Sequence, residues 1–139
     1  MGMTVWVNFR DDEKHESDGN DHSAVGDCAE QLDAIAERLS VKPLSSFFDD
    51  TDVRYNMDES GELEVSEDGW PASAAKWYSA AEGLKSVTTL LTYLKSNPAA
   101  LKKQDGWSQA DVIADLESCQ DTLSPAAQQG KPFHLLLVM

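Results

Sequence analysis

The chain has few cysteines and no long hydrophobic run. These two features indicate in which cell compartment it folds and whether it associates with a membrane. Its 139 residues include two cysteines, Cys28 and Cys119, which form neither a CxxC pair nor a metal-ligand spacing. We therefore expect two reduced, packed thiols and a cytoplasmic location. The longest apolar run, residues 135–139, is far shorter than the roughly 20 residues that cross a bilayer, and the N-terminus lacks the features of a secretion signal. We therefore expect no association with a membrane.

Basic residues are also scarce. The chain has 11 Lys and Arg against 25 Asp and Glu, which gives a formal net charge of −14. Phosphate-binding surfaces need clustered Lys and Arg, so we expect no nucleic-acid partner, and an anionic membrane surface would repel the chain. The same charge would steer a basic protein toward it. The catalytic motifs GxSxG, P-loop and GxGxxG are missing from the sequence, and no cofactor is predicted.

The first part of the chain alternates between strand and helix patterns. Hydrophobic residues make up 41% of the sequence, and this length suits one domain spanning residues 1–139. Apolar side chains alternate over residues 4–10, which predicts a half-buried strand. Residues 11–22 are polar and acidic and predict an exposed loop. Apolar side chains at three- and four-residue steps predict a helix over 24–39, with Ser23 as its N-cap.

The second part predicts a hairpin, two helices and a last strand. Residues 53–65 fit a hairpin around a glycine turn. A helix is predicted between Ser79 and Asn97, and another over 108–123. Residues 132–138 are apolar on both faces, which predicts a central strand paired with the first one. We therefore expect an α+β fold, in which three main helices pack on an antiparallel or mixed sheet of about four strands.

Residues 56–67 resemble the calcium-binding loop of an EF-hand. Oxygen-bearing side chains stand at the positions that carry calcium ligands: Asn56, Asp58, Ser60 and Glu67. An EF-hand also needs a helix on each side, and residues 69–71 (Gly-Trp-Pro) interrupt the second one. The competing interpretation, which we prefer, is the plain hairpin.

The acidic loop 11–22 offers a second group of candidate metal ligands. Its imidazoles and carboxylates, from His15, Asp18 and His22, are ligand types for zinc or iron(II). Their spacing does not force them to converge, so a solvated loop is the competing interpretation. His22 could also act as a base toward Cys28, but Cys28 falls on an apolar helix stripe and is better explained by packing.

The charge is distributed unevenly along the chain. Residues 1–70 carry a net charge of −14, whereas residues 71–104 carry +4 and contain several aromatic residues. Aromatic and basic residues together are typical of protein interfaces. The candidate interaction residues are Lys76, Trp77, Tyr78 and Lys85. A solvated helix face is the competing interpretation.

Two function classes remain open. The first is a non-catalytic interaction protein that binds a basic partner, or a second copy of itself as a homodimer. Antitoxin and immunity proteins share this composition, which is an analogy of composition only. The second is a small enzyme or a metal- or ligand-binding protein with its site near the 11–22 loop. No catalytic residue is assigned from the sequence.

Overall fold

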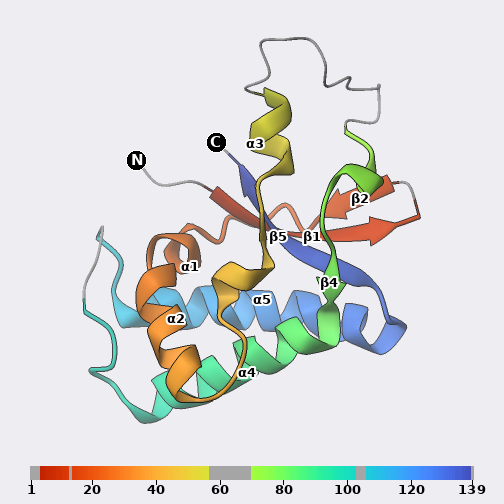
Figure 1. Ribbon diagram of the computed structural model, residues 1–139. Coiled ribbons are helices and arrows are strands. Elements are labelled where there is room, and N and C mark those ends of the chain that lie inside the picture. Colours follow the sequence, from red (N-terminus) through yellow and green to blue (C-terminus); the bar gives the residue numbers. More distant parts are fainter. Residues whose placement is uncertain (1–3, 13, 57–69, 103–105, 139) are drawn as a thin grey trace.

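Five strands form one sheet, and the longer helices pack against it (Figure 1). The computed structural model describes residues 4–12, 14–56, 70–102 and 106–138. The strands are β1 (Thr4–Asp11), β2 (Lys14–Ser17), β3 (Phe48–Asp49), β4 (Tyr78–Ser79) and β5 (Pro132–Val138). The helices are α1 (Ser23–Asp27), α2 (Ala29–Arg38), α3 (Thr51–Asn56), α4 (Ala80–Ser96) and α5 (Gln109–Gln129), with short 3₁₀ turns at Leu44–Phe47 and Ala72–Ala74. The predicted α+β class with three main helices is confirmed.

The sheet is built around β5. This strand pairs antiparallel with β1, from Thr4 opposite Val138 to Phe9 opposite Phe133, and β1 pairs antiparallel with β2. On its other edge β5 pairs with β3, which runs parallel, and with β4, which runs antiparallel. The sheet is therefore mixed, and the prediction of a central last strand paired with the first is confirmed.

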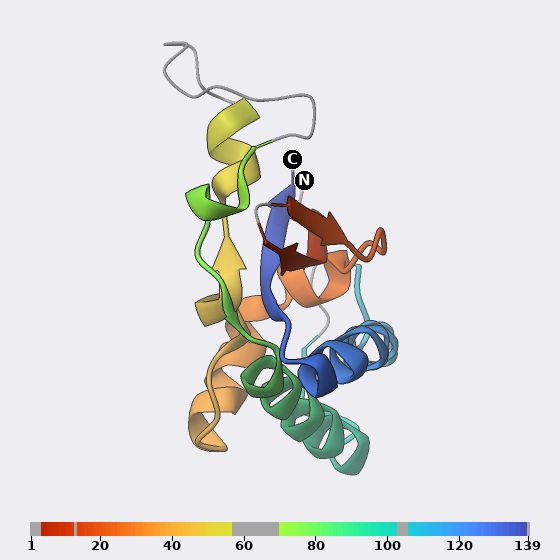
Figure 2. The ribbon, with the colours of Figure 1, turned by 90° about the vertical axis from the view of Figure 1, so that its right-hand side faces the viewer.

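The two faces of the sheet have different coverings. Val5 and Val7 of β1 and Leu135 of β5 belong to the buried apolar cluster, together with residues of α1, α2, α4 and α5. The opposite face is covered by the segment 70–77, which precedes β4. Figure 2 shows α3 and this segment on one side of β5, with α1 and α5 on the other. Each face positions one histidine cluster.

Capping residues fix the ends of the two longest helices. The Ser79 hydroxyl accepts a hydrogen bond from the Glu82 amide at the start of α4. Ser108 and Asp111 form a capping box at the start of α5, and Gly130, with a φ of 69°, ends that helix. α5 continues through Pro125, so the predicted end near residue 123 is six residues short. Among the described residues, no helix is both long enough and apolar enough to cross a membrane.

Two predictions of strand or loop are wrong. The first hairpin strand was expected from residue 53, but residues 53–56 belong to helix α3, because the Asp49 carboxylate accepts the Thr51 amide and Asp50 pairs with Arg54 one turn later. The remainder of the predicted hairpin, from residue 57 to 65, lies outside the described residues. Part of the expected 11–22 loop is strand β2, because residues 14–17 pair with the end of β1.

The predicted 24–39 helix is divided into α1 and α2 at Cys28. Ser23 does not cap it, because the N-cap position belongs to His22 and Ser23 already lies inside α1. The Ser23 amide and hydroxyl both bind the Asp21 carboxylate. The start of α1 therefore places His22, rather than Ser23, at the junction with the core.

Candidate functional site

His22 is carried into the interior by the segment that follows β2. The Asp18 amide donates to the Val7 carbonyl at 2.8 Å, and the His22 amide donates to the Val5 carbonyl at 2.9 Å. These bonds extend the contact with β1 beyond the end of β2 and bring His22 against α5. The His22 side chain is fully buried. A residue that the sequence places in an exposed loop is therefore part of the core.

Both ring nitrogens of His22 face carboxylates. The His22 Nε2 lies 2.7 Å from Asp18 Oδ2, and His22 Nδ1 forms a hydrogen bond with Asp115 Oδ1. The Cys119 Sγ lies 3.4 Å from the same Nδ1. We call His22, Asp18, Asp115 and Cys119 the His22 cluster. Asp115 and Cys119 are one helical turn apart on α5, so both face the ring.

The backbone fixes the two carboxylates of the cluster. Asp18 Oδ1 accepts from the amides of Val7 and Asn20, each at 3.2 Å. Asp115 Oδ2 accepts from the Val25 amide at 3.0 Å. Each carboxylate thus keeps one oxygen on the backbone and directs the other to His22. The imidazole is positioned from both sides before any ligand binds.

Hydrogen bonding determines the charge of His22. Burial alone lowers its pKa, but the hydrogen bonds to Asp115 and Asp18 outweigh that effect and raise the pKa of His22 to about 12. Burial raises the pKa of the Cys119 thiol, and the hydrogen bond to His22 offsets part of the increase. Without a bound ion, the cluster therefore holds an imidazolium between two carboxylates, beside a neutral thiol.

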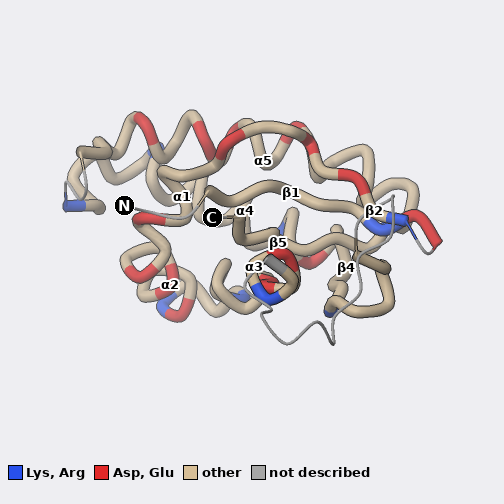
Figure 3. Tube along the Cα trace, turned by 90° about the horizontal axis from the view of Figure 1, so that it is seen from above, with Lys and Arg blue, Asp and Glu red and all other residues tan. Residues whose placement is uncertain are grey.

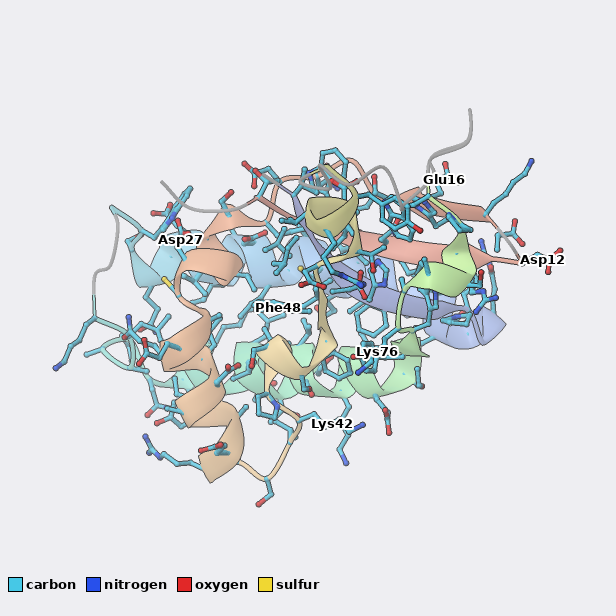
Figure 4. The ribbon with its side chains drawn as sticks, turned by 45° about the horizontal axis from the view of Figure 1, so that its top comes forward. Asp12, Glu16, Asp27, Lys42, Phe48 and Lys76 are labelled. Carbon is cyan, nitrogen blue, oxygen red and sulfur yellow. The ribbon has the colours of Figure 1, made fainter. Side chains whose placement is uncertain are left out.

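The donor atoms of the cluster converge. Ligand atoms of His22, Asp115 and Cys119 all lie within 4.8 Å of one another. A groove of about 380 Å³ lies beside them, and Asp115 is part of its lining along with Asp21, Trp107 and Asp111. Asp115 thus connects a buried group of donors to the surface. The Trp107 indole is held there by a 2.7 Å hydrogen bond to Asp27. Asp27 is the last residue of α1 (Figure 4).

A second histidine cluster lies on the other face of the sheet. The His15 ring stacks on Trp70 with 3.8 Å between centroids, and the His134 ring stacks on Trp77 at 4.0 Å. The amide nitrogen of Asn8 lies between the two imidazoles, 3.3 Å from His15 Nδ1 and 3.0 Å from His134 Nε2. We call these residues the Asn8 cluster: Asn8, His15, His134, Trp70 and Trp77.

The partners of the second cluster require neutral imidazoles. His15 Nε2 faces the Trp70 carbonyl at 3.1 Å, and His134 Nδ1 faces the Lys76 carbonyl at 2.9 Å. A carbonyl only accepts, so each of these nitrogens carries a proton. The remaining nitrogen of each ring then accepts from the Asn8 amide. Burial lowers the pKa of both His15 and His134, although hydrogen bonds to the backbone carbonyls oppose part of the decrease.

The structure separates the residues that the sequence grouped in one metal site. Asp18 and His22 come together, whereas His15 belongs to the Asn8 cluster. Cys28 is buried but does not belong to the His22 cluster. The thiol beside His22 is that of Cys119, not that of Cys28. We missed Asp115 and Cys119. Their four-residue spacing on a predicted helix is the signal that could have found them.

The EF-hand-like loop falls mostly outside the described residues. Asn56, the first ligand position, is the last residue of the short helix α3. Asp58, Ser60 and Glu67 lie beyond the described part of the chain. The calcium hypothesis therefore stays a prediction.

The predicted interaction residues are only partly at the surface. Lys76 is exposed next to β4 (Figure 4), and Lys85 is exposed on α4. Trp77 is stacked on His134 and donates its indole N–H to the Ala72 carbonyl at 2.7 Å. Tyr78 packs edge-on against Phe47, with 5.6 Å between centroids. The two aromatic residues thus hold the 70–79 segment, and the two lysines remain accessible.

Acidic residues recur along α5 and α2, as the red segments of the trace in Figure 3 show. Some of the acidic residues pair with lysine: Lys42 with Glu82 at 3.0 Å and Lys95 with Glu117 at 3.5 Å, with all four side chains about half exposed. Pairs this exposed contribute little to stability.

Comparison of the chain with known protein families, characterised proteins and solved structures finds no significant match. The chemistry of the site is therefore the basis for a function.

Proposed function

We propose that the protein binds a divalent transition-metal ion, best matched by Zn²⁺, through His22, Asp115 and Cys119. The observation that supports this proposal is the convergence of imidazole, carboxylate and thiol donors within 4.8 Å. Ligand atoms about 2.0–2.3 Å from a tetrahedral zinc lie roughly 3–4 Å from one another, so the cluster needs only small adjustments. The ion takes the place of the proton between His22 Nδ1 and Asp115, and of the thiol proton of Cys119.

Charge and hydrogen bonding both favour such an ion. A carboxylate and a thiolate together balance the two positive charges of the metal. Asp18 bonds the opposite ring nitrogen of His22, which is the usual arrangement of a carboxylate behind a metal-binding histidine. Soft thiolate and imidazole donors favour zinc over calcium or magnesium. The site therefore selects by ligand type.

Three protein ligands leave one coordination position of a tetrahedral ion for water or substrate. Sites of this composition are typical of catalytic rather than structural zinc. The groove lined by Asp115 is the route by which we propose that an ion and a small molecule reach this position. A thiolate ligand also requires a reduced cysteine, which fits the cytoplasmic location we expect.

Cobalt substitution tests the proposal, because cobalt(II) bound to a thiolate absorbs in the near ultraviolet by charge transfer. We expect one equivalent of Co²⁺ to produce this band in the full-length protein and Zn²⁺ to remove it by competition. Cys119→Ser should abolish the band, whereas the matched variant Cys28→Ser, at an equally buried cysteine, should keep it. A folded protein that gives no charge-transfer band, or a band that Cys119→Ser leaves unchanged, contradicts the proposal.

Asp18 gives a finer test, because it orients a ligand without being one. Asp18→Asn keeps the size of the side chain and all three donors. Loss of such a supporting group weakens metal affinity by about 10- to 100-fold. We therefore expect a weaker site with an unchanged cobalt spectrum, measured by competition with a chelator.

Binding of a basic protein partner is a second candidate function. It is supported by the acidic groove, where Asp21 and Asp111 lie beside Trp107, a residue type that accepts cationic side chains on its ring face. Native mass spectrometry of the protein isolated from its own cells would detect such a partner, and raised salt should dissociate it. A complex insensitive to salt, or a homodimer alone, counts against a basic partner.

A further inference from the structure

The Asn8 cluster contains an unusual atom. Asn8 is fully buried, and its Oδ1 is a buried side-chain atom without a hydrogen-bond partner among the described residues. Leaving a buried acceptor unpaired costs about 1–3 kcal/mol. Its amide nitrogen, in contrast, is shared between two imidazoles. The amide nitrogen of Asn8 thus has two hydrogen-bond partners, whereas its amide oxygen has none among the described residues.

Rotating the Asn8 amide by half a turn exchanges these roles. Oδ1 would then occupy the position between the rings, where it can accept from two N–H groups. Those N–H groups exist only when His15 Nδ1 and His134 Nε2 are both protonated. The opposite ring nitrogens are donors in both arrangements, so their bonds to the Trp70 and Lys76 carbonyls do not distinguish the two, and release of the segment has to come from the added charge. The structure therefore contains one hydrogen-bond arrangement for two neutral rings and another for two charged rings.

Protonation of one ring alone fits neither arrangement. With Nδ2 between the rings, the new N–H of the charged ring faces an amide N–H. With Oδ1 there, the lone pair of the neutral ring faces the carbonyl oxygen. We propose that Asn8 couples the protonation of His15 and His134, so that acidification releases the segment 70–77 from the sheet in one step.

The release follows from where the charges would lie. Both ring nitrogens are within 3.3 Å of one amide nitrogen, so two imidazolium rings would repel each other at short range in a buried site. The facing carboxylates are Asp49 of β3 and Asp52 of α3, which both favour protonation. Each already binds the segment, through the Lys76 amide and the Trp70 indole. The Arg10 guanidinium contacts the Asp12 carbonyl, and Lys76 is exposed.

The segment carries residues that bear on partner binding. It contains Lys76 and Trp77, two of the predicted interaction residues. His15 and His134 hold its two ends through hydrogen bonds to the Trp70 and Lys76 carbonyls. Trp70 is 4% exposed and Trp77 is half-buried while the rings are neutral. Release exposes two indole rings and the polar face of the sheet. Release of segment 70–77 is independent of the His22 cluster, which lies on the other face of the sheet.

An NMR titration of the three histidines tests this proposal on the unmodified chain. We expect His15 and His134 to be neutral at pH 7, with the proton on Nε2 and Nδ1 respectively, and to titrate together at one midpoint. Hydrogen exchange of the amides in 70–77 should accelerate at that same midpoint. Separate midpoints for the two rings, or protection of 70–77 that does not change through the titration, would overturn the proposal.

Asn8→Asp provides the second test. An aspartate accepts hydrogen bonds with both oxygens, so no rotation is needed and charged rings are favoured. We expect both midpoints to rise together, by about one pH unit or more. A rise of one ring alone would show that position 8 does not couple them. Ser17→Ala, opposite Asn8 on β2, is the matched control and should leave both midpoints in place.

Discussion

The two histidine clusters lie on opposite sides of one sheet and hold their rings in opposite charge states. His22 is placed between two carboxylates, whereas His15 and His134 are placed between backbone carbonyls and one amide. Burial disfavours the charged ring in every case. The difference therefore comes from what faces each ring nitrogen. An acceptor with full charge stabilises imidazolium, and a shared donor requires a neutral ring.

This contrast separates the chemistry available at the two clusters. The His22 cluster combines charge with a thiol, which are properties of a metal centre. The Asn8 cluster combines neutral rings with stacked indoles, and protonation of such rings can release the segment that they hold. Substitutions that remove either property should distinguish the clusters.

Removing His22 should produce the largest loss of stability. His22→Leu leaves the buried Asp18 and Asp115 carboxylates facing an apolar side chain. Removing one partner of a buried ion pair lowers the free energy of unfolding by about 3–5 kcal/mol. Urea unfolding monitored by circular dichroism measures the change. Glu117→Gln, an exposed position on α5 two residues after Asp115, is the control and should change the free energy of unfolding by less than about 0.5 kcal/mol. Equal effects of the two substitutions would contradict the account.

Zinc should stabilise the chain through the His22 cluster alone. At a free zinc concentration 100 times the dissociation constant, linkage predicts about 2.7 kcal/mol of added stability. We expect this increase in wild type and in Cys28→Ser, and none in Cys119→Ser. Thermal unfolding with and without zinc measures it. A shift of the same size in Cys119→Ser would place the ion elsewhere.

Acid should weaken the fold through the Asn8 cluster. The pKa of both rings is lowered in the folded state, so the unfolded chain binds more protons below the ordinary histidine pKa of about 6.5. Stability is therefore complete above that pH and is lost as the pH falls toward the folded values, with a slope of at most about 1.4 kcal/mol per pH unit for each ring. His15→Gln should reduce the slope. An unchanged slope would exclude this origin.

Two tryptophan substitutions should give the smallest effects and show the same contrast. Trp107 donates to the Asp27 carboxylate, whereas Trp77 donates to the Ala72 carbonyl. Charged acceptors contribute about 1.5–3 kcal/mol and neutral ones about 0.5–1.5 kcal/mol. We expect Trp107→Phe to lower the free energy of unfolding more than Trp77→Phe. The reverse order would show that stacking on His134 outweighs hydrogen bonding.

Periodicity predicted the elements whose own pattern determines them. The alternation in β1, the apolar β5 and the stripes of α4 and α5 all follow from local spacing, and these elements form as expected. The prediction failed at residues 53–56, where a carboxylate at Asp49 starts a helix in a stretch with strand propensity. It also failed at residues 14–17, where strand β2 depends on pairing with β1 rather than on its own hydrophobicity.

The site was less predictable than the fold, because it depends on contacts across long sequence separations. Asp18 and His22 were candidates from residue type, but 93 residues separate His22 from Asp115 and 97 separate it from Cys119. No spacing rule connects them. His15 was a candidate for the same reason and lies on the other face, because the two ends of the acidic loop turn to different sides of β1.

The most direct test is a measurement of the three imidazole side chains by nitrogen NMR at pH 7, before and after one equivalent of zinc. Without zinc, we expect His22 to carry protons on both ring nitrogens while His15 and His134 each carry one. With zinc, the Nδ1 signal of His22 should change to that of a metal-bound nitrogen, and the other two rings should keep their signals. Three similar neutral rings, or a zinc response at His15 or His134 in place of His22, would contradict this expectation.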